Sequence, residues 1–155
     1  MEGMDIGFKT SDGVFSLRVA ALIIRGNRLL LAKNEKLDCF YTVGGRIKVN
    51  ETAENAVLRE CHEETGCRLE IERLLFVQER FFQAAEVKHH EVVFFYLMKD
   101  ANVELPEGIN TDRQDEYLYW IAIDELESIN LLPIFLKTAL KNIPDGIGHI
   151  VSKEY

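Results

Sequence analysis

Three glutamates in the first half of the chain are spaced so that a helix would carry them on one face. Glu60, Glu63 and Glu64 stand at positions i, i+3 and i+4, which are neighbours on a helix surface. The same face carries small apolar residues one and two turns earlier, namely Ala53, Ala56 and Val57. Carboxylates on a face that looks inward need a cation, because a buried charge without a partner is costly. Hard divalent ions such as Mg²⁺ are held by oxygen ligands, so the spacing indicates a metal site.

Residues around these glutamates support that interpretation. Gly44 and Gly45 follow the strand-like residues 40–43, so the backbone can turn sharply and expose a carbonyl oxygen there. Arg59 precedes the first of the three glutamates and can reach Glu63 at i+4, which would hold that carboxylate in one rotamer. A turn, a cation and the carboxylates thus occupy one short segment.

The acidic segment begins before the expected helix, at Glu51, and either Asn50 or Thr52 could serve as the N-cap. A structural alternative stands beside the metal site, because glutamate-rich helices are often simply solvated. In that alternative the helix only supports the fold, so Glu63→Gln would leave activity unchanged. Mg²⁺ would then not raise the melting temperature either.

The segment from Gly45 to Cys67 reads GRIKVNETAENAVLRECHEETGC. It fits the pattern G-x5-E-x7-R-E-U-x-E-E-x-G-U, where U is a bulky apolar residue, and the chain therefore resembles the Nudix hydrolase family. The matching positions are Gly45, Glu51, Arg59, Glu60, Cys61, Glu63, Glu64, Gly66 and Cys67. The departures are small. Cysteine fills both apolar positions, where it packs as a small hydrophobe, and Val43 stands where many members have proline.

The resemblance implies an enzyme that cleaves a nucleoside diphosphate linked to another group, with Mg²⁺ as cofactor and Mn²⁺ as an alternative. The implied metal ligands are the Gly45 carbonyl, Glu51, Glu60, Glu63 and Glu64, with Glu51 in a supporting or outer position. Arg59 would fix the geometry of the carboxylates. Arg46 would touch a substrate phosphate, although a merely exposed arginine explains it nearly as well. The chain has no GxSxG, GKS/T or HExxH motif, so serine-nucleophile, P-loop and zinc-protease mechanisms lack support.

The general base stays open between two glutamates. Within the Nudix family it is sometimes a glutamate of the box, here Glu60, and sometimes an acid on a distant loop, here Glu116. Because the polar residues 100–116 contain many acids, Glu116 could equally be solvated. His89 and His90 precede an apolar strand, where packing or exposure explains them better than catalysis. The catalytic candidates are therefore Glu60, Glu63, Glu64, Arg59 and Glu116.

Aromatic residues that could stack on a nucleobase are present, although aromatics in strands more often belong to the core. They are Phe81, Phe82, Tyr117, Tyr119 and Trp120. Downstream of the box the chain has Phe82 and Gln83 instead of the proline typical of many ADP-ribose pyrophosphatases. The tyrosine signature of coenzyme A and dinucleoside polyphosphate hydrolases is also missing. Elimination favours a nucleoside triphosphate or a modified nucleotide, with ADP-ribose or a nucleotide sugar as the alternative substrate. The alternative function is a catalytically silent Nudix-like module that binds nucleotides or regulates a partner.

Periodicity predicts the elements that must position these residues. Strands are expected at residues 18–24, 28–32, 40–43, 68–82, 92–98 and 118–123. Helices are expected at residues 52–65, ended by Gly66, at a capping-box segment over 124–127, and over the apolar repeat at 132–143, ended by Pro144. Residues 100–116 are expected to form a long surface loop. The prediction is an α/β fold with a mixed central sheet flanked by two helices, which is also the α/β/α sandwich of the Nudix architecture.

Length and charge agree with one compact domain over residues 1–155. Of the 155 residues, 47 % are hydrophobic, which is enough to bury one core. The formal net charge of −8 argues against a nucleic-acid partner, and the longest apolar run, residues 92–98, is too short to span a membrane. The three cysteines form no CxxC pair and the start has no signal-peptide pattern, so a cytoplasmic location is expected. A small-molecule nucleotide is the expected partner, and the resemblance allows a homodimer.

Overall fold

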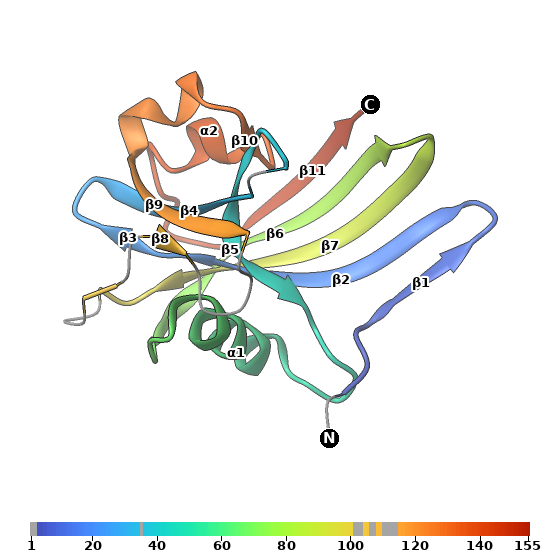
Figure 1. The fold of residues 1–155 in the computed structure, drawn as a ribbon, viewed down its shortest axis with the longest axis horizontal. Coiled ribbons are helices and arrows are strands. Elements are labelled where there is room, and N and C mark those ends of the chain that lie inside the picture. Colours follow the sequence, from blue (N-terminus) through green and yellow to red (C-terminus); the bar gives the residue numbers. More distant parts are fainter. Residues whose placement is uncertain (1–2, 35, 101–103, 106–107, 110–114) are drawn as a thin grey trace.

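The computed structural model describes residues 3–34, 36–100, 104–105, 108–109 and 115–155. Its centre is one mixed β-sheet with helices on both sides (Figure 1). The long helix α1 (Ala53–Thr65) covers one face, and the short helices η1 (Ile123–Ser128) and α2 (Leu136–Ala139) cover the other. The predicted α/β fold class is therefore confirmed. In the described part of the chain, no helix is long and apolar enough to cross a membrane.

The sheet is built from strands of very different lengths. In chain order they are β1 (Gly7–Thr10), β2 (Gly13–Leu22), β3 (Ile24–Arg25), β4 (Arg28–Asn34), β5 (Phe40–Arg46), β6 (Ile71–Ala84), β7 (Val87–Met98), β8 (Gly108–Ile109), β9 (Glu116–Ala122), β10 (Leu131–Leu132) and β11 (Gly148–Glu154). The main path runs β11-β6-β7-β2-β5-β4-β9-β8, with β1 on β2, β3 on β4 and β10 on β5. The pairs β2–β7, β6–β11 and β5–β10 are parallel. Figure 1 shows β1, β2, β6 and β7 extending together beyond the helices.

Two hydrophobic cores lie on opposite faces of the sheet, because successive strand residues point to alternate sides. On β2, Val19 and Ala21 pack in the core that α1 covers, whereas Ala20 and Leu22 pack in the core beneath η1 and α2. Burial on both faces explains the continuous apolar run of this strand. The strand β7 lies between β6 and β2, so residues 92–98, which the sequence predicts as a strand, lie inside the sheet and not at its edge.

The helix α1 begins and ends where the sequence predicts. Thr52 is the N-cap, and its side-chain oxygen accepts a hydrogen bond of 3.1 Å from the Asn55 backbone N–H. Gly66 is the C-cap with φ of 75°, a left-handed conformation that suits glycine. These caps fix which residues of the helix face β5, the strand that carries Gly44 and Gly45.

The C-terminal part of the chain differs from the prediction. The expected helix at residues 132–143 is reduced to α2, and Leu131–Leu132 forms β10 against β5 instead. Residues 124–127 belong to the 3-10 helix η1, whose N-cap Ala122 makes no side-chain cap, so the capping-box prediction is wrong. No pattern in the sequence predicts β1 or β11. In β11, Ser152 is turned toward the protein while Val151 is 56 % exposed, so apolar alternation does not mark that strand.

The expected surface loop at residues 100–116 lies mostly outside the described residues. Asp100, Glu104 and Asp115 are exposed as expected, but other described residues of this segment do not behave as a solvated loop. Leu105 is 5 % exposed, Gly108–Ile109 pairs with β9 as the strand β8, and Glu116 is the first residue of β9 itself. The loop prediction is therefore wrong at these positions, since backbone pairing and burial continue into them.

Candidate active site

The end of β5 and the middle of α1 meet through two glycines. A Cβ atom at Gly45 would lie 2.3 Å from Oε1 and 2.6 Å from Cδ of Glu60, so only glycine leaves room for that carboxylate. The backbone N–H of Gly44 donates a hydrogen bond of 2.9 Å to Oε2 of Glu64. Because Glu60 and Glu64 are one helical turn apart, each carboxylate meets one of two adjacent glycines of the strand, Glu60 at Gly45 and Glu64 at Gly44.

The three glutamates of the helix differ in burial. Glu60 is 6 % exposed and Glu64 only 1 %, although both are acids. The side chain of Glu63 is 36 % exposed and lies at the edge of the same face. Buried carboxylates are retained only where charged or hydrogen-bonding partners surround them. The helix therefore presents two enclosed carboxylates and one that reaches solvent.

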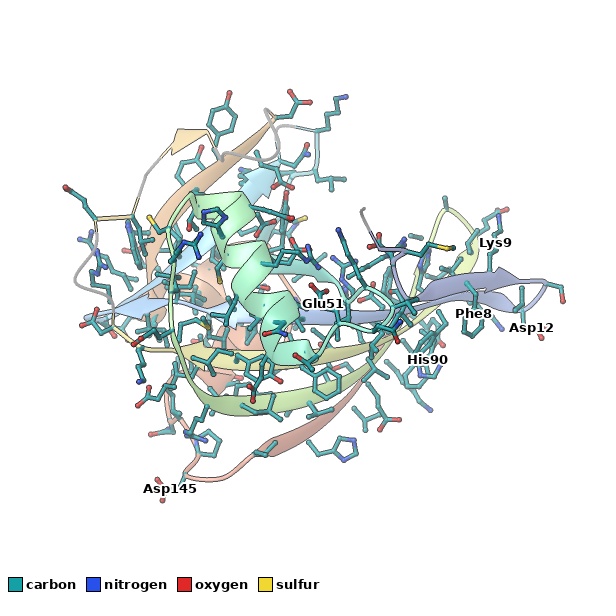
Figure 2. All side chains as sticks on the ribbon, turned by 90° about the horizontal axis from the view of Figure 1, so that it is seen from below. Phe8, Lys9, Asp12, Glu51, His90 and Asp145 are labelled. Carbon is teal, nitrogen blue, oxygen red and sulfur yellow. The ribbon has the colours of Figure 1, made fainter. Side chains whose placement is uncertain are left out.

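Arg59 links the acidic residues of this segment into one network. Its guanidinium contacts Glu51 twice, from Nε to Oε2 at 2.7 Å and from Nη2 to Oε1 at 2.9 Å. Nη1 contacts Oε1 of Glu60 at 2.9 Å and Oε2 of Glu63 at 3.2 Å. Nη2 also donates to the backbone oxygen of Arg46 at 3.1 Å, while the Arg46 residue itself is exposed. The predicted contact between Arg59 and Glu63 is present, and Figure 2 shows Glu51 beside α1.

This network changes the acid–base properties of two of its members. The hydrogen bonds from Arg59 hold the pKa of the Glu51 carboxyl below its ordinary value, and partial burial opposes that shift. The Lys48 backbone N–H adds a hydrogen bond of 3.0 Å to Oε1 of Glu51. Conversely, the hydrogen bonds to Glu51 raise the pKa of the Arg59 guanidinium above its ordinary value. Both side chains therefore carry their charges at neutral pH.

The chemistry of the donors fits a hard divalent cation. Carboxylates of Glu51, Glu60 and Glu63 already gather around one positive group, the Arg59 guanidinium, and oxygen ligands of this kind are those that Mg²⁺ takes. Because Gly45 has no side chain, the Glu60 carboxylate can lie directly against the backbone of the strand. Within the described ranges, no three acidic, histidine or cysteine side chains are grouped closely enough to hold a metal as they stand. The predicted ligands therefore stay a prediction, supported by the donor set.

Glu116, the second candidate base, is enclosed rather than solvated. It is 2 % exposed at the start of β9, and the Tyr41 hydroxyl donates a hydrogen bond to its Oε1. Alternation along β9 puts Glu116 on the same face as Leu118 and Trp120, which pack in the core that α1 covers. Glu116 thus lies on the face of the sheet that α1 covers, which is also the face that the glutamates of α1 approach. Tyr41, which the sequence did not single out, is thus in direct contact with one of the candidate bases.

The histidines and two of the aromatic candidates lie elsewhere. Phe81 stacks on His90 with ring centroids 4.3 Å apart, and Phe82 stacks on His89 at 4.7 Å. These pairs sit where β6 and β7 extend beyond the helices, and Figure 2 shows His90 near Phe8 at that end, away from α1. The interpretation of both histidines as packing residues agrees with these ring contacts.

A cavity of about 230 Å³ lies on the face of the sheet opposite α1. Its floor comes from β2, β6 and β7, and Gly44 lies on its rim, so the cavity borders the segment that contacts Glu64. None of the five aromatic candidates is among the described residues that line it, whereas Tyr41 is. Sequence analysis missed this cavity because its residues come from distant segments. Arg18 interrupts a largely apolar stretch of β2, whereas Gln78 lies in β6 among several other polar residues and gives no signal.

Comparison with known proteins gives a consistent result. The chain matches the family model of the NUDIX domain over residues 14–142. It is 28 % identical over 120 residues to the 8-oxo-dGTP diphosphatase of Buchnera aphidicola, a match that covers 72 % of this chain and 81 % of that protein. The chain spans 66 % of the length of two curated mouse relatives, to which it is 28 % identical over 115 residues.

Solved structures support the same grouping. The crystal structure of a MutT NUDIX hydrolase from Burkholderia pseudomallei aligns with a TM-score of 0.60 at 31 % identity, covering 71 % of this chain and 84 % of that one. A MutT protein from Bacillus halodurans aligns with a TM-score of 0.70 at 16 % identity, covering 89 % and 90 %, which shows a shared fold. The family match includes the glycine pair, α1 and the Arg59 network. This chain belongs to the NUDIX hydrolase family.

Proposed function

We propose that this chain is a pyrophosphohydrolase that uses a divalent metal, Mg²⁺ or Mn²⁺, to cleave a nucleoside triphosphate or a modified nucleotide by attack of water on phosphorus. The observation that carries the proposal is the contact between the glycine pair of β5 and the buried glutamates of α1. A relative named as an 8-oxo-dGTP diphosphatase supports a nucleotide substrate.

The proposed metal ligands come from one strand end and one helix. They are the Gly45 carbonyl, Glu51, Glu60, Glu63 and Glu64. When bound, the metal would neutralise phosphate oxygens and activate water, which is the chemistry that divalent ions supply in phosphoryl transfer. Buried carboxylates suit this task because they interact with a cation more strongly than carboxylates in water.

The chain's own side chains would organise the site. Arg59 holds Glu51, Glu60 and Glu63 through hydrogen bonds of 2.7 to 3.2 Å, so that their rotamers are set before a ligand arrives. The Gly44 N–H orients Glu64 in the same way. Arg46, exposed at the end of β5, is proposed to meet a substrate phosphate from the solvent side.

We propose Glu116 rather than Glu60 as the general base. Glu60 is already held by Arg59 at 2.9 Å and lies against Gly45, which suits a metal ligand. Glu116 is enclosed on the same side of the sheet, and the Tyr41 hydroxyl fixes one of its oxygens. A carboxylate held in one orientation is what a general base requires, since geometry precedes pKa in such a role.

The test is release of nucleotide and phosphate from a substrate panel, with metal and with chelator. The panel contains nucleoside triphosphates, oxidised nucleotides, ADP-ribose and nucleotide sugars. Wild type is compared with Glu63→Gln and with the matched control Glu54→Gln, which changes an exposed acid of the same helix. Turnover that needs metal, is lost in Glu63→Gln and is kept in Glu54→Gln supports the proposal.

The competing function, a silent nucleotide-binding module, makes a different prediction. Such a module would bind one nucleotide of the panel tightly and would release no product with any metal. Equal activity of Glu63→Gln and wild type would instead support the alternative in which the acidic helix is only structural.

A further inference from the structure

The strand β1 has a neighbour on one side only. It pairs with β2 from Gly7 to Thr10, and the residues just before it, 4–6, pair on the same side with residues 47–49. Figure 1 shows β1 at the margin of the sheet, next to β2. Among the residues that the structure describes, no strand lies on its other side. A margin of this kind exposes backbone N–H and C=O groups that another strand can bind.

Hydrogen bonds fix which residues of this segment face outward. Three bonds of 2.8 to 3.1 Å, two of Ile6 and one of Met4, join their backbone groups to residues 17, 47 and 49 of the sheet. Because backbone groups of successive strand residues point to opposite edges, every second residue faces away from the sheet. The residues whose N–H and C=O groups face outward are therefore Asp5, Gly7 and Lys9.

The outward residues form a charge pattern that is symmetric about a glycine. Gly7 lies midway between Asp5, which is acidic, and Lys9, which is basic. Both charged side chains are exposed, and neither has an ion pair with any residue that the structure describes. Since side chains alternate between faces, Asp5 and Lys9 share one face, and Ile6 and Phe8 share the other. Figure 2 shows Phe8 and Lys9 leaving β1 on opposite sides.

This pattern is complementary to itself when two copies of the strand run antiparallel. If Gly7 of each copy lies on a two-fold axis, Lys9 of each copy lies opposite Asp5 of the other. Ile6 and Phe8 then lie opposite each other on the second face, as an aliphatic–aromatic pair. A register centred on Phe8 would instead place Lys9 opposite Gly7 and leave both charges without a partner. The charges therefore select the register about Gly7.

We propose that the outer edge of residues 5–9 is an interaction surface for a second copy of this chain, which adds its own β1 in antiparallel register about Gly7. The outward N–H and C=O groups of each copy bond to those of the other, so the two sheets join into one. Opposite charges and matched apolar residues across an antiparallel pair both favour this contact. Because each copy uses the same surface, the assembly closes as a dimer.

The margin formed by β11 suits a second copy less well. Its one acid, Glu154, is already bound by Arg80 at 2.6 Å and by the Ile134 N–H at 3.2 Å. The other charged side chain of the strand at neutral pH, Lys153, would therefore meet no free carboxylate on a second β11. Among the described strands at the margins of the sheet, β1 is the one with two unpaired, opposite charges.

Sedimentation velocity of the full chain over a wide range of concentrations tests the proposal. Wild type is expected to sediment as a dimer. Lys9→Asp would place two acids opposite each other at both ends of the pairing, and Asp5→Lys would place two lysines there. Each is expected to raise the dissociation constant at least about tenfold, since like charges directly across a strand pair are destabilising and the symmetry counts each change twice. The matched control Lys88→Asp reverses an exposed charge on the interior strand β7 and should dimerise as wild type does.

Mixing the two variants tests the register itself. Lys9→Asp carries only acids at the two positions and Asp5→Lys carries only lysines, so an equimolar mixture is expected to recover the dimer that neither forms alone. The double variant Asp5→Lys/Lys9→Asp exchanges the two charges and is expected to dimerise as wild type does. Recovery in either experiment also shows that the single variants are folded and lost only the pairing.

Three results would overturn the proposal. A wild type that stays monomeric up to millimolar concentration would show that Lys9 instead protects the edge against pairing, as lysines on edge strands often do. A dimer that forms equally well in Lys9→Asp would place the interface elsewhere. Species larger than a dimer would contradict a contact that closes on itself. The proposal concerns assembly alone, so each result is independent of the hydrolase activity proposed above.

Discussion

Gly45 and Glu60 are in such close contact that a single methyl group at the glycine would occupy the position of the carboxylate. The missing Cβ of Gly45 leaves Oε1 and Oε2 of Glu60 within 2.3 and 2.8 Å of where that atom would be. Glu60 is 6 % exposed and held by Arg59 from the other side, so it has little room to move away. The placement of this carboxylate thus depends on the absence of a side chain on the neighbouring strand.

Gly45→Ala is therefore expected to displace Glu60 while the protein still folds. A shift of about 1 Å in a catalytic group can lower activity about 100-fold, and a loss of that size in kcat/KM is expected here. Steady-state kinetics and a thermal melt of the same preparation measure it. Gly146→Ala is the control, because a Cβ there meets no atom within 4 Å. Wild-type kinetics in Gly45→Ala would contradict the role of this contact.

Glu51→Gln should reduce stability in a manner that depends on pH. Since the pKa of Glu51 is lower in the folded state, the ionised carboxylate favours folding above the pKa of the unfolded chain. This contribution is lost as the pH falls through the lower, folded-state pKa. Urea unfolding in chelator should show wild type more stable than the variant at pH 7 by about 1.5 to 3 kcal/mol, and the gap should close in acid.

The control for that experiment is Glu54→Gln, which changes an exposed glutamate without an ion pair among the described residues. Its stability is expected to stay close to that of wild type at every pH. A gap between wild type and Glu51→Gln that is constant from pH 7 down to strongly acidic pH would contradict the assignment of the ion pair with Arg59.

Glu116→Gln is expected to lower kcat by about 100-fold or more if this residue is the base, because general base catalysis contributes about that much. Tyr41→Phe should lower kcat less, since it removes only the hydrogen bond that orients the carboxylate. The preceding acid gives a matched control: Asp115→Asn changes an exposed residue and should retain full activity. Full activity in Glu116→Gln would return the role of base to Glu60.

Mg²⁺ should raise the melting temperature of the wild type, because a ligand that binds only the folded state stabilises it. At 100 times the dissociation constant the gain is about 2.7 kcal/mol. Chelator should abolish the shift, and Glu63→Gln should reduce it. An equal shift in wild type and Glu63→Gln would show that the ion binds elsewhere, whereas Glu54→Gln should respond as wild type does.

The predictable part of the site is local in sequence. The Thr52 cap, the Gly66 stop and the contact between Arg59 and Glu63 all lie within one helix, where spacing of three or four residues fixes neighbours. The two hydrogen bonds between Arg59 and Glu51 do not follow from helix spacing. Glu51 precedes the helix, and its position depends on the turn at Lys48.

The C-terminal elements could not be predicted for the opposite reason. Leu131–Leu132 pairs with Phe40–Tyr41, and Gly148–Glu154 pairs with residues 76–82, so the partners are about 70 to 90 residues away. The apolar repeat at 132–143 reflects burial, because Leu136 and Leu140 pack into the core beneath η1 and α2. The short helix α2 and the loop after it bury these side chains as well as a long helix would.

By itself, the sequence determined that a capped helix presents Glu60, Glu63 and Glu64 on one face beside an arginine and a glycine pair, because helix geometry converts spacing into proximity. Tertiary structure alone decided which groups from distant segments lie beside one another. Strand register brought Arg18 and Gln78 into one row, and the pairing of β4 with β9 brought Glu116 within reach of Tyr41. Register of this kind depends on contacts between segments far apart in the chain, which no local pattern encodes.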